Sequence, residues 1–341
     1  MEKVEGINRL IIQNSFNDTI NDLQEINIKL PKDPDPVLFD FADQVYPKTG
    51  ELVTTIDEIK AINLDPKDPE IINWLNKTIV AYDESINKFS ALEGTAYLMS
   101  HSLVVLGETD FIPLCLLAFY FYTRSKDITS RTKHIKFSAN PEMDSQIDFI
   151  HDKIDILTKY SPKDSLLFID GPLIGGDVYT YMIRDVGKFL SKGIIPVYFV
   201  KNSTSNLVTD NIPELKDKFN SDMHWAYTFL KKGQRTNFFK YADRNNIRNA
   251  KIFCYMKGFE ISPQRIEFHV DTFNKYQNKI NSIMNLAYYL MLVQGNLRNP
   301  QIRPIAIAEK YARAIIQLIN LDKIVRDSGL IPTMNQERFG W

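Results

Sequence analysis

From residue 77 onward the chain alternates between short apolar segments and longer segments with helical periodicity. The segments typical of strands are residues 77–85, 94–107, 165–171 and 194–202, and helical spacing covers 146–158 and 178–193. Strands that alternate with helices predict an α/β architecture in which helices cover a sheet. Because the first two apolar segments follow one another without a helix between them, we expect a hairpin and a mixed sheet.

Other segments extend this pattern. The apolar run at 111–122 is too short to span a bilayer, so we expect a buried helix or a pair of strands there. Further along the chain we expect a helix at 213–232, a late hairpin from 251–258 and 264–273, and strong helices at 275–294 and 304–325.

The sequence before residue 77 has a different character. Apolar residues recur at helical spacing across 7–30, whereas 31–70 is rich in turn-forming residues and acidic on balance. We therefore expect three parts: an N-terminal helical and irregular extension at 1–76, an α/β domain at 77–326 and a C-terminal tail at 327–341.

Composition and motifs exclude several classes of protein. The formal net charge of −1 gives no global field toward nucleic acid or a membrane, and the two cysteines argue against a disulfide framework. The five histidines lack the spacing of zinc ligands, and P-loop, GxGxxG and nucleophile-elbow motifs are absent. Residues 1–10 lack the apolar core of a signal peptide, so we expect a cytoplasmic protein without membrane segments.

Two of the expected buried strands end in aspartate, at Asp83 and at Asp170. Each aspartate alone is explained by a helix N-cap or a turn, where this residue type is favoured. Together they suggest a crevice, because neighbouring strand ends meet at one edge of a sheet. Two close carboxylates repel unless a cation lies between them, and hard oxygen ligands suit magnesium or manganese.

Two more acidic residues and one lysine extend this hypothesis. Asp152 lies at the border of the apolar face of its helix, and Glu309 points toward the apolar side of another. A buried glutamate must be paired, protonated or bound to a metal, so an internal salt bridge is the alternative at Glu309. Lys201 follows a buried strand and could contact a phosphate.

Two segments are rich in basic residues. Residues 231–251 hold seven Lys or Arg against one Asp, with Phe238, Phe239 and Tyr241 interleaved, and 123–136 hold five against one. Such segments can bind nucleic-acid phosphates and stack bases on their aromatic rings. The alternative for each segment is a solvated loop.

The sequence resembles the NurA family of nucleases. The resemblance covers residues 77–325 and is carried by LLFIDGPL (166–173), GIIPVYFVKNSTSNL (193–207) and RPIAIAEKYAR (303–313). It implies an RNase H-like mixed β-sheet flanked by helices, and a homodimer. It also implies DNA degradation with Mn²⁺ or Mg²⁺, by two-metal hydrolysis, in partnership with a HerA-type hexameric ATPase that processes DNA ends during repair.

The resemblance also assigns roles to individual residues. Asp83 would be the first metal ligand and Asp170 the ligand on the next parallel strand. Asp152 would be the helical acid, commonly Glu in the family, and Lys201 the basic residue that follows the next strand. Glu309 stands where the family usually presents a histidine. The implied metal ligands are therefore the four acids, with Lys201 as an additional catalytic residue.

Departures from the family pattern leave two other hypotheses open. Glu84 follows the first aspartate where a glycine is usual, and Glu309 replaces a histidine. These changes are compatible with a weakened or inactive DNA-binding or motor-adaptor subunit. A third possibility is an unrelated α/β enzyme that binds a small anion at the turn 171–177. Residues 7–30 and the tail, with Phe339 and Trp341, are candidates for a partner interface.

Overall fold

The structure is a computed structural model of the 341-residue chain. It describes residues 10–25, 51–106, 111–174, 183, 185–243 and 250–333. The tail residues Phe339 and Trp341 lie outside this described part, as does most of the segment 1–50.

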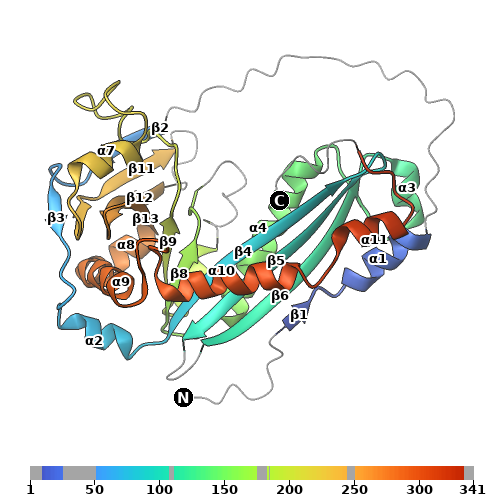
Figure 1. The fold of residues 1–341 in the computed structure, drawn as a ribbon, viewed down its shortest axis with the longest axis horizontal. Helices are drawn as coiled ribbons and strands as arrows, with labels where there is room; N and C mark the ends of the chain where they lie inside the picture. Colours follow the sequence, from blue (N-terminus) through green and yellow to red (C-terminus); the bar gives the residue numbers. More distant parts are fainter. Residues whose placement is uncertain are drawn as a thin grey trace.

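A thirteen-stranded sheet forms the centre of the described part (Figure 1). Its main path runs in the order β1-β6-β5-β4-β8-β9-β13-β12-β10-β3, while β11 pairs with β12 and β2, and β7 pairs with β6. The strands are β1 (Leu10–Ile12), β2 (Glu51–Thr55), β3 (Ala61–Asn63), β4 (Ile79–Ser90), β5 (Thr95–Leu106), β6 (Phe111–Thr123), β7 (Lys136–Phe137), β8 (Leu166–Asp170), β9 (Ile195–Val200), β10 (Gln234–Thr236), β11 (Phe239–Asp243), β12 (Ala250–Lys257) and β13 (Gln264–His269).

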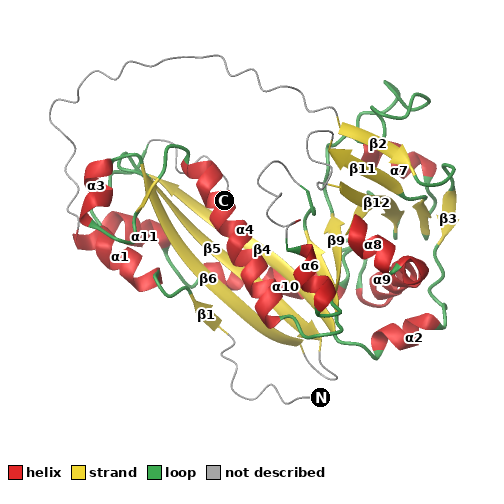
Figure 2. Cartoon of the chain, turned by 180° about the vertical axis from the view of Figure 1, so that it is seen from behind, coloured by secondary structure: helices red, strands yellow, loops and turns green. Residues whose placement is uncertain are grey.

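Helices cover both faces of this sheet (Figure 2). They are α1 (Phe16–Glu25), α2 (Glu70–Leu75), α3 (Lys126–Arg131), α4 (Pro141–Tyr160), α6 (Val186–Ser191), α7 (Asp222–Phe229), α8 (Val270–Lys275), η2 (Gln277–Lys279), α9 (Ile280–Gln294), α10 (Arg303–Ile316) and α11 (Leu321–Asp327). Among the described helices, none is long and apolar enough to cross a membrane.

The strands β6-β5-β4-β8-β9 have the order and directions of an RNase H-like core. β4, β5 and β6 form an antiparallel meander, and β8 and β9 then run parallel to β4. The expected mixed sheet flanked by helices is therefore confirmed. The late hairpin is present as well, because β12 and β13 pair antiparallel and β13 continues the sheet beside β9.

The segment before residue 77 contributes strands as well as helices. β2 pairs with β11 and β3 pairs with β10, so residues 51–55 and 61–63 belong to the sheet. Within 7–30, the described residues form the short strand β1, which pairs with β6, and the helix α1. The division of the chain at residues 77 and 326 remains a prediction.

Two strand predictions need correction. β4 does not end at Asp83 but continues to Ser90, because it pairs with β5 along its whole length. What ends near Asp83 is the parallel pairing with β8, whose last partners are Tyr82 and Ile169. The apolar run at 111–122 forms one long strand, β6, because β5 supplies an equally long partner.

Alternation along the strands divides the apolar core into two layers. Ala81 and Phe168 face α9 and α10 and belong to the same core cluster as Ile305 of α10. Val80 and Ile169 face α4 on the other side of the sheet. α10 crosses β4, β5 and β6 diagonally, whereas α4 lies behind them (Figure 1). Consecutive residues at the end of a strand therefore point to different sets of helices.

Candidate metal centre

The strand register brings Asp83 and Asp170 together. Tyr82 pairs with Ile169, so Asp83 and Asp170 are the next residues on two adjacent parallel strands. Both are in phase with residues that face α10, so their side chains leave the same face of the sheet. The chain turns away directly after Asp170, at Gly171, whose φ of 97° is a conformation that glycine adopts without strain.

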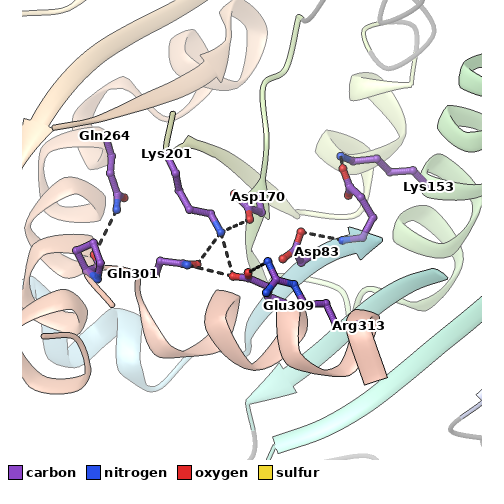
Figure 3. Close-up of polar contacts among 10 residues, drawn as sticks. Asp83, Lys153, Asp170, Lys201, Gln264, Gln301, Glu309 and Arg313 are labelled. Atoms are coloured by element: carbon purple, nitrogen blue, oxygen red, sulfur yellow. Dashed lines mark hydrogen bonds and ion pairs between the residues drawn. The ribbon is translucent and has the colours of Figure 1, made fainter. Parts of the chain in front are cut away.

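α10 supplies the third carboxylate. Ile305, Ala308 and Ala312 are buried against the sheet, and Glu309 lies on the adjoining side of the same helix. Carboxylate oxygens of Asp83, Asp170 and Glu309 all lie within 4.8 Å of one another. Figure 3 shows these three side chains converging from β4, β8 and α10.

Lys201, directly after β9, lies beside the three acids. Its Nζ is 2.5 Å from Oδ2 of Asp170 and 3.2 Å from Oε2 of Glu309. It also donates to Oε1 of Gln301 at 2.9 Å, and Gln301 in turn donates to Glu309. Arg313, one helical turn after Glu309, pairs with its other oxygen at 2.6 Å but is 70% exposed. Lysine and glutamine thus hold two of the three carboxylates in place (Figure 3).

The electrostatics of the three acids are unequal. Burial and the neighbouring charge of Asp170 raise the pKa of Asp83 to about 8. Burial also disfavours ionisation of Glu309, but a hydrogen bond from Gln301 and the charge of Lys201 outweigh it and lower its pKa. Burial opposes the charge of Lys201, yet the nearby carboxylates raise its pKa, Asp170 most of all. The charge of Lys201 lowers the pKa of Asp83 less than burial and Asp170 raise it, so Asp83 is the least compensated of the three acids.

The donor set suits a divalent cation. Three carboxylates offer hard oxygen atoms from rigid elements, which is the chemistry that Mg²⁺ and Mn²⁺ prefer. A cation near Asp83 and Asp170 would relieve the repulsion that raises the pKa of Asp83. The group therefore fits a metal centre, with Asp83, Asp170 and Glu309 as the candidate ligands.

The structure does not bring Asp152 into this group. Asp152 lies on α4, which covers the other face of the sheet, and its Oδ2 accepts a hydrogen bond of 2.9 Å from the Tyr120 hydroxyl. Burial raises its pKa to about 7, although the bond from Tyr120 opposes this shift. The separation follows from strand alternation, since Asp83 faces α10 and α4 packs on the opposite side. A metal role for Asp152 stays a prediction.

Sequence reasoning did not find the ion pair next to the acids. Glu84 points to the α4 face, where its carboxylate pairs with Nζ of Lys153 at 3.2 Å. The Lys153 side chain is only 1% exposed. A signal was present in the sequence: the residues three and four positions from Lys153 on either side are all apolar, which places the lysine within the buried face of α4. On the same face Tyr82 shares a hydrogen bond of 2.6 Å with His101.

The basic segments have structural roles in the described part. Phe238, Phe239 and Tyr241 are buried in the core, so their rings cannot stack on bases, and Arg235 and Lys251 are buried too. In the structure, the segment 231–251 forms β10, β11 and the start of β12. Residues 244–249 lie outside the described part. The segment 123–136 is mainly α3 and exposed side chains.

The chain was compared with curated proteins and with solved structures. No curated protein matches the chain. Among solved structures, NurA nuclease from Sulfolobus solfataricus is 10% identical, with a TM-score of 0.46 over 74% of this chain and 83% of that one. A NurA structure with manganese is 10% identical, with a TM-score of 0.39 over 77% and 94%. Endonuclease V from Bacillus subtilis is 9% identical, with a TM-score of 0.39 over 75% and 84%.

The family comparison covers most of the chain. The model of the NurA domain matches residues 28–314, a span that contains the three convergent acids and Lys201. It begins before the expected α/β domain and takes in β2 and β3, which join the sheet. This chain belongs to the NurA family.

Proposed function

We propose that the chain is a metal-dependent DNA nuclease. The observation that carries the proposal is the convergence of Asp83, Asp170 and Glu309 within 4.8 Å, beside Lys201, in a chain of the NurA family. Burial and the charge of Asp170 oppose ionisation of Asp83, and a bound cation would offset both effects. Mn²⁺ or Mg²⁺ is the cofactor that this donor set would hold.

The chain's own residues have distinct roles in this proposal. Asp83 and Asp170 hold the cation, and Glu309 holds Lys201 in position through a bond of 3.2 Å. Lys201 places a positive charge where a scissile phosphate develops negative charge. A bound divalent cation supplies Lewis-acid polarisation of a phosphate oxygen and lowers the pKa of bound water. Asp152 enters the proposal only through the family resemblance.

The family relationship also supports proposals about partners and context. We infer a DNA substrate, a homodimer and a HerA-type hexameric ATPase as the motor partner, acting at DNA ends in the cytoplasm during repair. The resemblance implies two-metal hydrolysis. The number of cations is a separate question from cation dependence, because a single bound cation already supplies the Lewis acid.

The test is a nuclease assay on linear and circular DNA, single- and double-stranded, with Mn²⁺, Mg²⁺ or EDTA. Asp170→Asn is expected to lose activity by a factor on the order of 10² to 10³, as when a group that stabilises transition-state charge is removed. Asp155→Asn is the matched control, because it changes an exposed acid on α4. Full activity in Asp170→Asn, or equal activity in EDTA, contradicts the proposal. The same assay on Asp152→Asn tests the helical acid.

A second candidate, a non-catalytic DNA-binding adaptor, is favoured by one observation. Lys201 already bridges Asp170 and Glu309, so two of the three carboxylates have a partner without any metal. An adaptor predicts salt-sensitive DNA binding without hydrolysis, and an unchanged Tm on adding Mn²⁺. A rise in Tm with Mn²⁺ that Asp83→Asn abolishes argues against the adaptor.

A further inference from the structure

The carboxylates of the candidate metal centre are not equivalent in their partners. Asp170 and Glu309 share Nζ of Lys201, at 2.5 Å and 3.2 Å, and Gln301 contacts both Lys201 and Glu309. Asp83 has no cationic partner within ion-pair distance among the described residues, and its Oδ1 accepts only the backbone N–H of Glu84, at 2.8 Å. The one place where positive charge is missing is therefore beside Asp83.

The lysine is fixed by its surroundings. Lys201 directly follows β9, which is paired on both sides, by β8 and by β13. Its Nζ has three oxygen acceptors on three different side chains, and these acceptors lie on β8, on α10 and just before α10. An ammonium with three acceptors satisfies all three of its donors, so displacing it breaks three charge-assisted hydrogen bonds.

Among the described residues, the opposite side of the sheet adds no fourth carboxylate to the three that converge. α4 directs Lys153 toward Glu84, and this pair lies next to Asp83 along β4. Asp148 and Asp152, one turn apart on that helix, accept hydrogen bonds from Tyr122 and Tyr120. Within the described part of the chain, the carboxylates that converge are three.

The charges of the centre balance with one divalent cation. The three carboxylates carry three negative charges, of which Lys201 offsets one and a single divalent cation would offset the other two. Arg313 also pairs with Glu309, but it is largely exposed, so water and salt screen its charge and it is left out of this balance. A second divalent cation would leave this partly buried centre with excess positive charge unless Lys201 moved out. Excess charge in a low-dielectric site is unfavourable.

We propose that this chain binds one divalent cation, held mainly by Asp83 and Asp170, and that Lys201 takes the place of a second. The inference rests on the proposed function and narrows it. It assigns Lys201 a permanent role as the second positive charge, and it makes Glu309 a residue that positions Lys201. It also accounts for the absence of Asp152 from the centre, since one cation needs fewer acidic ligands than two.

The experiment measures bound Mn²⁺ on the full chain without DNA. EDTA-stripped protein is titrated with Mn²⁺, and bound metal is counted by calorimetry and by electron paramagnetic resonance. Two ions about 4 Å apart give a spin-coupled spectrum, whereas one ion gives an uncoupled one. We expect one uncoupled Mn²⁺ per chain, with affinity lowered at least about tenfold in Asp83→Asn and unchanged in Asp155→Asn.

Lys201 is tested by two substitutions. Lys201→Met removes the charge and should admit a second, spin-coupled Mn²⁺, whereas Lys201→Arg keeps the charge and should retain one. The Tm of each metal-free variant checks that it is folded. Two coupled ions in the unsubstituted chain, or one ion in Lys201→Met, overturns the inference while leaving cation dependence intact. No bound Mn²⁺ at all overturns the proposed function itself.

Discussion

Two ionic clusters lie on opposite faces of the same sheet and differ in their balance of charge. The metal-centre cluster has three acids and Lys201; Asp83 is buried, whereas Lys201 and Glu309 remain 25% and 21% exposed. The second cluster consists of Glu267, Lys251 and Arg265 on β12 and β13. There Glu267 is fully buried and pairs with both cations at 2.7 Å.

The second cluster has the features of a structural network. Glu267 also accepts the backbone N–H of Leu173 at 2.8 Å, just after β8, and Arg265 donates to Ser203 and Ser205, just after Lys201. It therefore holds the two segments that follow the strands of the metal centre. Every charge in it has a partner, which is how buried ions are tolerated. The metal-centre cluster instead leaves Asp83 the least compensated, and acids with a raised pKa of this kind cluster at functional sites.

The largest expected effect lies in the second cluster. Glu267→Gln would leave two buried cations without their shared carboxylate, so the free energy of unfolding should fall by about 3–5 kcal/mol. Glu309→Gln serves as the comparison: Lys201 keeps Asp170 as a partner, so its change should stay below about 1 kcal/mol. Urea denaturation of both variants measures the difference. Equal losses would remove the distinction between the clusters.

The second-largest effect is expected for Asp83→Asn, which should lower nuclease activity but raise the stability of the metal-free protein. Asp83→Asn should lower nuclease activity by a factor on the order of 10² to 10³. Without metal at pH 7, the same change should raise the free energy of unfolding by about 1–3 kcal/mol, because it removes an acid whose ionisation is opposed by burial and by Asp170. Stability is compared by urea denaturation in EDTA. A variant that is both inactive and less stable would point to a structural role for Asp83.

The pH dependence should separate the clusters further. When the folded state raises the pKa of an acid, the free energy of unfolding falls as pH rises through the range between the unfolded and folded pKa values. The pKa of Asp83 is raised from 3.8 to about 8, so the metal-free protein should lose stability from about pH 4 to pH 8. The pKa of Glu267 is lowered by Lys251 and Arg265 despite its burial, so its contribution is lost as pH falls.

Metal affinity gives the readout for Asp83. Below pH 8 a cation must displace the proton of Asp83, so the apparent affinity for Mn²⁺ should rise about tenfold per pH unit and level off above pH 8. Calorimetry between pH 6 and 9 measures this slope. A flat profile would show that Asp83 is already ionised without metal. Its pKa would then not be raised, and the contrast with the lowered pKa of Glu267 would be lost.

The sequence predicts some parts of the metal-centre cluster but not others. Sequence patterns alone could identify four residues of the metal-centre cluster, because polar residues are unusual where apolar segments end or on the apolar face of a helix. These residues are Asp83, Asp170, Lys201 and Glu309. The position of Asp152 on the other face of the sheet could not be read from the sequence, since helical periodicity shows which side of a helix is apolar but not which face of the sheet it covers.

The second cluster illustrates a different limit. Arg265 and Glu267 alternate with Ile266 and Phe268, a pattern that resembles a strand with one solvated face. That face is buried because residues 171–174 and 203–222 lie over it, a long-range contact that no local pattern encodes. The end of β4 was missed for a similar reason, because only pairing with β5 carries the strand past Asp83.

The smallest expected effect concerns the exposed edge of the metal-centre cluster. Arg313 pairs with Glu309 at 2.6 Å, but it is 70% exposed, so water and salt screen its charge. Arg313→Ala should change the free energy of unfolding by less than about 0.5 kcal/mol. Mn²⁺ affinity should rise by less than about threefold at low salt, and the change should vanish near 1 M salt.

Arg265→Ala is the matched substitution in the second cluster. It removes a cation that is only 6% exposed, together with its hydrogen bonds to Ser203 and Ser205, so it should destabilise the fold far more than Arg313→Ala at every salt concentration. If the two arginine variants lost equal stability, or if the loss at Arg265 disappeared in high salt, burial would not be what distinguishes the two clusters. The contrast would then have to rest on Asp83 alone.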